Sequence, residues 1–293
     1  MRAHELGAVG IGLYRTEFLF LQRNELPDEE EQFQCYRDAL LAMQGQPVTI
    51  RTVDLGADKA DRTGLVLADE DNPALGLRGV RLMLARPAVA KTQLRALLRA
   101  SAYGPLRILV PMVSVREELL AMRRLINKLS AELREQGHEV ADQVPMGAMI
   151  EVPAAALTLD SLIDLVDFVS IGSNDLVQYL MAADRNHEAL GPLYSPLHPA
   201  LLRLLRMVIE TAQAHAKPVA VCGEMAGDPA LTPLLLALGL TELSLHSSTL
   251  LQVRRAIRSC EHTVLQQLRP KLLQQRDRRG VEKWLARLPS SSR

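Results

Sequence analysis

The sequence lacks the features of a secreted or membrane-spanning protein. No apolar run among its 293 residues approaches the roughly 18 residues that a helix needs to cross a bilayer. The first residues, MRAHELGAVGIGLYR, are too polar for a signal peptide. Only three cysteines are present, Cys35, Cys222 and Cys260, and an odd, widely spaced set fits a reducing compartment. These absences favour a cytoplasmic protein.

The sequence also lacks an excess of charge and the common nucleotide-binding motifs. Lys plus Arg and Asp plus Glu both number 34, so no overall field favours nucleic acid or a membrane. The segment Gly10–Gly12 reads GIG without the remaining glycine of a dinucleotide fingerprint, and there is no P-loop. Eight basic residues lie between Leu268 and Arg293, but only Trp284 could stack there on a base. That stretch therefore favours a solvated helical face over an RNA site.

Short apolar runs alternate with longer amphipathic segments along the chain. The runs have the length and β-branched content of buried strands, and lie at Val9–Tyr14, Pro47–Val53, Leu106–Met112, Met146–Ile150, Val166–Ile171, Val219–Val221 and Leu243–His246. The amphipathic segments predict helices, at Glu29–Met43, Arg81–Ala102, Val115–Glu135, Pro199–Ala216, Pro229–Leu238 and Thr249–Ser259. This alternation predicts the α/β class with a parallel sheet.

The predicted architecture is a (β/α)8 TIM barrel, with an open doubly wound sheet as the alternative. Polar residues recur at the carboxyl ends of the runs, where such barrels carry active sites. Seven strands can be counted, and the chain begins in a predicted helix that leads into the Val9 strand. We therefore expect a barrel without its first strand, truncated at the N-terminus. The barrel is expected over residues 1–262, with a basic helical tail over 263–293.

Two carboxylates follow neighbouring predicted strands. Glu151 comes directly after Met146–Ile150, and Asp175 follows Val166–Ile171 in the segment GSND. Mg²⁺ is usually held by one or two carboxylates together with substrate phosphate oxygens, which this pair would suit. The alternative is that Glu151 is a strand-end acid and Asp175 a helix N-cap.

Four arginines lie near the same strand ends. Arg15 and Arg51 end the first two runs, Arg78 follows the loop in NPALGLR, and Arg185 lies in AADR. The planar guanidinium group can grip a phosphate or a carboxylate at two points. Their shared position suggests a small substrate that carries both groups, although each arginine alone could be a surface or structural residue.

Cys222 ends the strand in PVAVCGEMAGD. A free cysteine is usually a small buried hydrophobic residue. At a strand end beside cations, its thiol could instead exchange a proton.

The segment Asp54–Arg78 is rich in glycine, aspartate and proline and has little periodicity. Long loops of this kind in compact domains are usually functional or disordered. Asp58 and Lys59, within it, could reach a phosphate or a metal ion, but with low specificity.

Eight ordered motifs resemble a known family. GIGLYRTEFLF, IRTVDLGADK, NPALGLRGVR, LRILVPM, MIEVPAAA, SIGSNDLVQY, ADR and CGEMAGD are similar to the phosphoenolpyruvate-binding barrel of enzyme I of the bacterial phosphotransferase system, phosphoenolpyruvate-protein phosphotransferase. Pyruvate phosphate dikinase and phosphoenolpyruvate synthase carry a more distant version. The resemblance covers roughly residues 5–260.

The resemblance implies a role for each candidate residue. Phosphoenolpyruvate would be contacted by Arg15, Arg51, Asn174, Asp175 and Arg185, with Arg78 as a further phosphate contact. Glu151 and Asp175 would hold Mg²⁺. Cys222 would protonate the enolate on the way to pyruvate.

The resemblance also implies an activity and partners. The family moves the phosphoryl group of phosphoenolpyruvate to a histidine of a separate swivelling domain and onward to a phosphocarrier protein, and it forms homodimers. None of the seven histidines lies in the Gly/Thr/Ser-rich motif of that domain, so we expect this chain to be the C-terminal portion of such a protein. Alternatively, it is a module that binds phosphoenolpyruvate and Mg²⁺ and dimerises, or an inert fragment. Sugar uptake and nitrogen-linked regulation both stay open.

Overall fold

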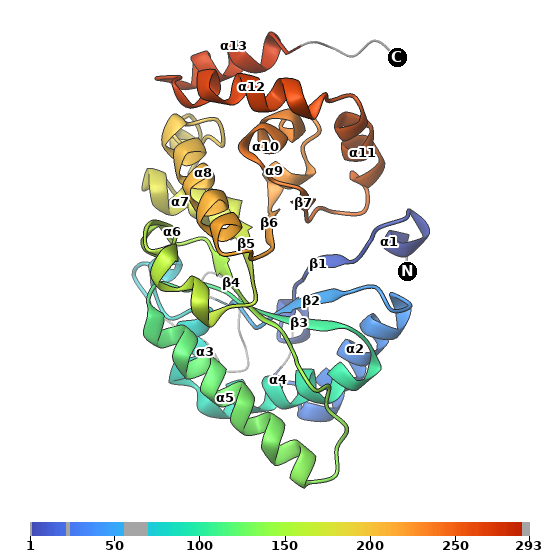
Figure 1. Cartoon of the computed structure of the whole chain (residues 1–293). Helices are drawn as coiled ribbons and strands as arrows, with labels where there is room; N and C mark the ends of the chain where they lie inside the picture. The colour runs from blue at the N-terminus through green and yellow to red at the C-terminus, as the bar shows by residue number, and fades with distance from the viewer. Residues whose placement is uncertain (1, 22–23, 56–69, 289–293) are drawn as a thin grey trace. The chain divides into compact units, whose positions relative to one another are not determined.

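Short strands and longer helices alternate along the computed structural model, which describes residues 2–21, 24–55 and 70–288 (Figure 1). Seven strands lie in these residues: β1 (Ile11–Tyr14), β2 (Val48–Arg51), β3 (Leu106–Val110), β4 (Met146–Ile150), β5 (Phe168–Gly172), β6 (Val219–Cys222) and β7 (Glu242–Leu243). Their order in the sheet is their order in the chain. A doubly wound sheet reverses its strand order at a switch point, so that alternative is excluded. The predicted α/β class of the barrel type, with seven strands in the described residues, is confirmed.

The chain divides into two compact units. The first contains Ala3–Met149 and Asp164–Phe168, and the second contains Ile150–Ile163 and Val169–Arg293. The strands pair in parallel within the first unit and within the second. The predicted division into residues 1–262 and 263–293 stays a prediction.

In the first unit, α4 packs on β3. The helices of this unit are α1 (Arg2–Glu5), α2 (Glu29–Ala42), α3 (Val80–Ala85), α4 (Pro87–Ala100) and α5 (Arg116–Glu135), with short 3-10 turns η1 (Glu17–Leu19), η2 (Pro73–Leu75) and η3 (Ser101–Tyr103). Helix α4 packs against both α2 and α5. Every residue of β2 is buried. Helix α5 buries one face, as its apolar spacing predicts: Leu119, Met122, Ile126, Leu129 and Leu133.

The single helix predicted over Arg81–Ala102 is wrong. The chain forms α3 and α4 instead, and the break between them falls at Arg86. Arg86 adopts φ −124° and ψ 70°, outside the helical region. The cause is Pro87, whose ring disfavours the helical conformation of the residue before it and which opens α4 as its first residue.

In the second unit, α8 packs on β6. The helices of this unit are α6 (Pro153–Leu157), α7 (Ser173–Met181), α8 (Pro199–Ala214), α9 (Glu224–Gly227), α10 (Thr232–Leu238), α11 (Leu250–Arg258), α12 (His262–Leu273) and α13 (Arg278–Ala286), with 3-10 turns η4 (Leu159–Ser161), η5 (Ile163–Leu165, shared with the first unit) and η6 (Glu188–Leu190). Helix α8 contacts β6, α7 and α10.

The strand predicted over Leu243–His246 is displaced. Strand β7 is Glu242–Leu243, and the chain then turns at His246. The His246 ring accepts a hydrogen bond from the Ser248 backbone N–H at 3.3 Å, and the His246 carbonyl accepts one from Thr249 N–H at 3.0 Å. This local turn ends the strand early.

The last two described helices cover part of the second unit. Helix α12 packs on α10, and α13 packs on α12 (Figure 1). Leu265, Leu272, Val281 and Trp284 are buried, whereas the basic side chains of α13 are exposed. The Trp284 indole donates to the Leu268 carbonyl at 3.2 Å. No helix of the described ranges is both long and apolar enough to cross a membrane.

A charged network joins α2 to α4 on the surface of the first unit. Glu29 accepts from Arg95 Nε at 2.6 Å and from Arg99 Nη1 at 2.9 Å, and Arg99 also binds Glu30 at 2.7 Å. Partial burial alone would raise the pKa of Glu29, but the hydrogen bonds and charges of Arg95 and Arg99 outweigh it and hold the pKa below the usual 4.5.

We therefore predict that the unfolding free energy of Glu29→Gln depends less on pH in the acid range than that of the parent. A carboxyl whose pKa is lowered by folding stabilises the protein above its unfolded pKa, and this contribution is lost as the pH falls through the folded value. The parent and the variant should differ in unfolding free energy at pH 7, and the difference should disappear as the pH falls below 4.5. Urea unfolding at several pH values measures this, with the exposed Glu25→Gln as control. A difference that persists unchanged into acid would contradict the role of Glu29.

Candidate functional site

In the first unit, three of the predicted arginines follow β1 and β2. Arg15 comes directly after β1 and is exposed. Arg51 is the last residue of β2, and Arg78 lies between η2 and α3. Arg51 is 7% exposed and Arg78 is 8% exposed. Two of the three guanidinium groups are therefore buried, which is costly unless countercharges accompany them.

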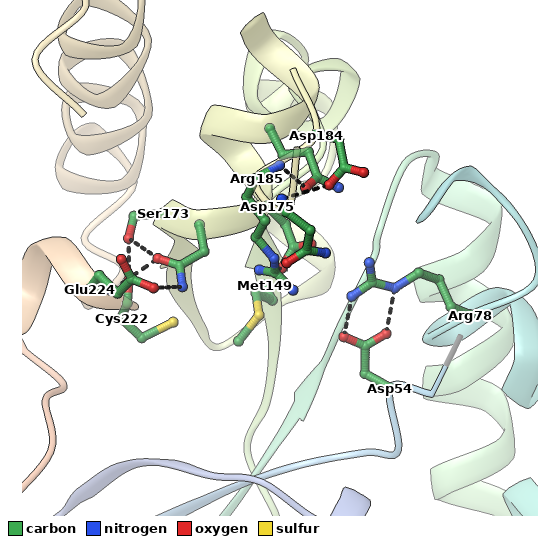
Figure 2. A network of polar contacts seen from close by, with 12 residues as sticks. Asp54, Arg78, Met149, Ser173, Asp175, Asp184, Arg185, Cys222 and Glu224 are labelled. Carbon is green, nitrogen blue, oxygen red and sulfur yellow. Dashed lines mark hydrogen bonds and ion pairs between the residues drawn. The ribbon is translucent and has the colours of Figure 1, made fainter. Parts of the chain in front are cut away.

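The countercharges are Asp54 and Glu17. Asp54 accepts two hydrogen bonds from Arg78, at 2.9 and 2.7 Å, in the two-point geometry visible in Figure 2. Arg51 lies 3.2 Å from Asp54 Oδ2 and 3.0 Å from Glu17 Oε1. Glu17 Oε1 also accepts from the Asp54 backbone N–H at 3.0 Å. Among the described residues, two arginines and two acids form one buried cluster, and their formal charges sum to zero.

In the second unit, the predicted carboxylates follow β4 and β5. Glu151 is the first residue after β4 and is 1% exposed. Asp175 lies in the first turn of α7, where a negative charge is favourable near the positive end of the helix dipole. The alternative that Asp175 is the N-cap is wrong, because α7 is capped by Gly172. Arg185 Nη1 lies 3.8 Å from Asp175 Oδ2, so these two predicted residues come together.

Asn174 is held by Glu224 and Tyr194 in the second unit. Its Oδ1 accepts from the Glu224 backbone N–H at 3.0 Å, and its Nδ2 donates to Glu224 Oε1 at 3.4 Å. Its carbonyl accepts from the Tyr194 hydroxyl at 3.0 Å. Burial, together with the charge of Glu224, raises the pKa of Tyr194 to about 12. Tyr194 therefore stays a neutral donor around neutral pH.

Cys222 is buried at the end of β6, where both its thiol and its backbone are bonded. Its Sγ donates to the Ile171 carbonyl at 3.4 Å and accepts from Ser170 Oγ at 3.7 Å. Ser173 Oγ donates to the Cys222 carbonyl at 2.8 Å, and Figure 2 shows Ser173, Cys222 and Glu224 grouped together. A buried thiol with these bonds has a defined position, as a proton donor requires.

Residue 223, which follows Cys222, must be glycine. Gly223 has φ +94°, and a Cβ there would lie 2.4 Å from Ser173 Oγ and 2.7 Å from Asn174 Oδ1. Any side chain would push apart the end of β6 and the start of α7. This glycine keeps Cys222 close to Ser173 and Asn174.

Several residues at these sites were missed from the sequence. They are Glu17, Asp54, Tyr194 and Glu224. The first two follow Arg15 and Arg51 by two and three residues, and an acid so close to each arginine was the available signal. Asp58 and Lys59 lie outside the described residues.

The carboxylates of the second unit fit a magnesium site better than a zinc site. Among the described residues, no group of three or more His, Cys, Asp or Glu side chains could hold a metal ion by itself. Mg²⁺ does not need such a cage, because it commonly uses one or two carboxylates with water and substrate phosphate. Glu151 and Asp175 are oxygen donors of that kind, and their role stays a prediction.

Comparisons with known proteins agree on a family. A family model described as "PEP-utilising enzyme, PEP-binding domain" matches residues 1–262. A protein from Cupriavidus necator named phosphoenolpyruvate-protein phosphotransferase is 53% identical over 253 residues, which are 86% of this chain and 43% of that protein. A protein of the same name from Staphylococcus carnosus is 47% identical over 270 residues, 92% of this chain and 47% of that protein. The chain thus spans less than half the length of these relatives.

A solved structure supports the fold. A citrate lyase from Burkholderia xenovorans matches with a TM-score of 0.52 and 17% sequence identity, covering 88% of this chain and 76% of that chain. At this identity the likeness shows the fold alone.

The buried cluster predicts a large effect of Asp54→Asn. The substitution keeps the shape of the side chain but removes its negative charge. Of the two acids described in the cluster, Glu17 alone would then remain to balance Arg51 and Arg78. We expect a loss of about 3–5 kcal/mol of unfolding free energy, as when one partner of a buried ion pair is removed. Denaturant unfolding measures it.

The matched control is Asp38→Asn. Asp38 pairs with Arg37 at 2.8 Å, but its side chain is 61% exposed. An exposed pair of this kind contributes about 0–1 kcal/mol. Equal losses for both variants would show that the Asp54 cluster does not stabilise the first unit.

Proposed function

The chain belongs to the family of phosphoenolpyruvate-binding domains of PEP-utilising enzymes, and we propose that it takes the phosphoryl group of phosphoenolpyruvate for transfer to a histidine of a separate domain. The phosphoryl group then passes to a phosphocarrier protein, and pyruvate is released. The observation that carries this proposal is the 53% identity to a protein named phosphoenolpyruvate-protein phosphotransferase. Because the match spans 43% of that relative, the transfer is proposed for the chain acting with a histidine-bearing domain.

The proposed substrate contacts are guanidinium, amide and carboxylate groups that follow the strands. They are Arg15, Arg51, Asn174, Asp175 and Arg185, with Arg78 as a further phosphate contact. Arginine suits a ligand with a phosphate and a carboxylate, because its planar fork binds either group at two points. In phosphoryl transfer the protein mainly positions groups and offsets charge, which is the work that such residues do.

The formal charges of the described candidate residues favour a requirement for Mg²⁺. In the first unit, Arg51 and Arg78 are already paired with Glu17 and Asp54. In the second unit, Glu151 and Asp175 accompany the single candidate arginine, Arg185. Among these described residues, much of the positive charge that a phosphoenolpyruvate anion would need is therefore already compensated. We propose that Glu151 and Asp175 hold Mg²⁺, which would supply that charge and template the phosphate oxygens.

Cys222 is the proposed proton donor. Once the phosphoryl group has left, the enolate of pyruvate takes a proton at its methylene carbon: a C–H bond forms there, and the S–H bond of Cys222 breaks. The thiolate is then reprotonated from solvent. The buried thiol at the end of β6, with hydrogen bonds on both sides, supports this role.

We also propose a cytoplasmic homodimer. The odd, widely spaced set of three cysteines supports a reducing compartment. The family resemblance supports the dimer, and the pathway served is sugar uptake or nitrogen-linked regulation.

Substrate binding is tested by calorimetry with phosphoenolpyruvate, with and without Mg²⁺. The parent should bind only with Mg²⁺. Arg15→Ala should weaken binding by about 2–5 kcal/mol, the range for removing one partner of a charged contact. Arg15 is exposed, so its loss should leave the melting temperature unchanged. Arg51→Ala should abolish binding, but because it also removes a member of the buried cluster, its melting temperature has to be measured alongside.

Arg107→Ala is the control for these variants. Arg107 lies on β3, where its guanidinium sits 5.7 Å from the Phe168 ring centroid, and it has no proposed substrate role. Its affinity for phosphoenolpyruvate should equal that of the parent. Unweakened binding by both Arg15→Ala and Arg51→Ala would show that the assigned pocket is wrong.

Turnover is tested by pyruvate release from phosphoenolpyruvate and Mg²⁺ in the presence of a histidine-bearing domain. The parent should release pyruvate, and Cys222→Ser should bind phosphoenolpyruvate but release little, because a serine hydroxyl is a far weaker acid. Cys260→Ser, at a half-buried thiol after α11, should behave as the parent. A parent that binds without releasing pyruvate would favour the alternative, a binding and dimerisation module without turnover.

A further inference from the structure

A buried glutamine links the ends of β1 and β2 in the first unit. Gln93 lies on α4 and is 0% exposed, in a helix face otherwise made of alanine and leucine. A side-chain amide in such a place costs free energy unless its donors and acceptor are bonded, whereas leucine would carry no such cost. The amide therefore needs an explanation beyond packing.

All the polar groups of Gln93 are bonded to the strand ends or to a chain of side chains behind them. Its Oε1 accepts from the Val53 backbone N–H at 2.9 Å. Its Nε2 donates to Thr16 Oγ1 at 3.1 Å and to Tyr36 Oη at 3.0 Å. Thr16 Oγ1 in turn donates to the Arg51 carbonyl at 3.0 Å. The Gln93 side chain thus bonds Thr16, the residue after Arg15, and Val53, the residue after Thr52. Through Thr16 it is also linked to the carbonyl of Arg51, the residue before Thr52.

The direction of every bond in this chain is fixed. A backbone N–H can only donate, so Val53 must face the amide oxygen of Gln93, and the Arg51 carbonyl can only accept. Tyr36 Oη must then donate onward, which it does to Gln32 Oε1 at 3.0 Å. Burial raises the pKa of Tyr36, which keeps that hydroxyl protonated. Flipping the amide would set donor against donor at Val53, so one arrangement is favoured.

We propose that Gln93 is a positioning residue for phosphoenolpyruvate, which fixes the backbone from which the Arg15 and Arg51 side chains extend. The proposal rests on the proposed function. A guanidinium group can grip a phosphate at two points only if its main chain is held in place, since small displacements lose the second bond. Gln93 bonds the Val53 backbone N–H directly and reaches the Arg51 carbonyl through Thr16. It is not among the proposed substrate contacts.

The test compares two ways of losing buried hydrogen bonds. Gln93→Leu and Thr16→Val remove the links to the strand ends. Gln32→Leu removes the link between Tyr36 and the Pro27 carbonyl, which Gln32 Nε2 contacts at 2.9 Å at the far end of the chain. Gln32 is as buried as Gln93, at 1% exposure, so its loss should lower the melting temperature in a similar way.

Affinity for phosphoenolpyruvate with Mg²⁺ is measured by calorimetry, well below the melting temperature of each variant. Gln93→Leu and Thr16→Val should weaken binding about tenfold, the scale of one lost buried hydrogen bond. Thr16→Ser, which keeps the hydroxyl, should restore the parent affinity, and Gln32→Leu should match the parent. Parent-like binding by Gln93→Leu, or equal weakening by Gln32→Leu, would overturn the proposal.

Hydrogen exchange at the Val53 amide separates this proposal from the proposed function. Gln93→Leu should speed exchange there, and Gln32→Leu should leave it slow. If the parent fails to bind phosphoenolpyruvate, the proposed function fails, and the exchange rates still decide whether Gln93 fixes these strand ends. Equal exchange in the parent and in Gln93→Leu would overturn the fixing role.

Discussion

The cost of burying a guanidinium group governs the first unit. Arg51 and Arg78 are almost wholly removed from water, and an unpaired buried charge would be strongly destabilising. Asp54 forms ion pairs with both arginines. Glu17 forms an ion pair with Arg51 and also accepts a hydrogen bond from the backbone N–H of Asp54. These ion pairs hold both guanidinium groups in place. Among the described residues, the same pairing offsets the charge of the two arginines.

In the second unit, three consecutive residues at the start of α7 make polar contacts with Cys222, Glu224 and Arg185. Successive side chains on a helix point about 100° apart, because a turn takes 3.6 residues. Ser173 therefore reaches the Cys222 carbonyl, Asn174 reaches Glu224, and Asp175 reaches Arg185. One short turn of helix thus sets the positions of a thiol, an amide and a carboxylate. The glycine after Cys222 makes this close approach possible.

The sequence was sufficient for most of the strands, because runs such as Met146–Ile150 are buried throughout and have strand length, although the last strand ends at Leu243, earlier than predicted. It was insufficient where one residue overrides a pattern: the apolar spacing of Arg81–Ala102 continues across Pro87, although the helix does not. The placement of the candidate site residues at strand ends followed from the same reasoning. The partners Glu17 and Asp54 did not. Asp54 pairs with Arg51 three residues away, but the pairs Arg51–Glu17 and Arg78–Asp54 join residues 34 and 24 positions apart and leave no periodic trace.

Trp284 is the only tryptophan of the chain, and it is buried where α13 meets α12. Indole emission depends on the polarity around the ring, so tryptophan fluorescence, excited at a wavelength that tyrosine does not absorb, reports on the contact between α13 and α12. A thermal transition followed by this emission would not record the unfolding of the arginine-bearing first unit, which circular dichroism would record. Any mismatch between the two optical signals would then mark stepwise rather than concerted unfolding.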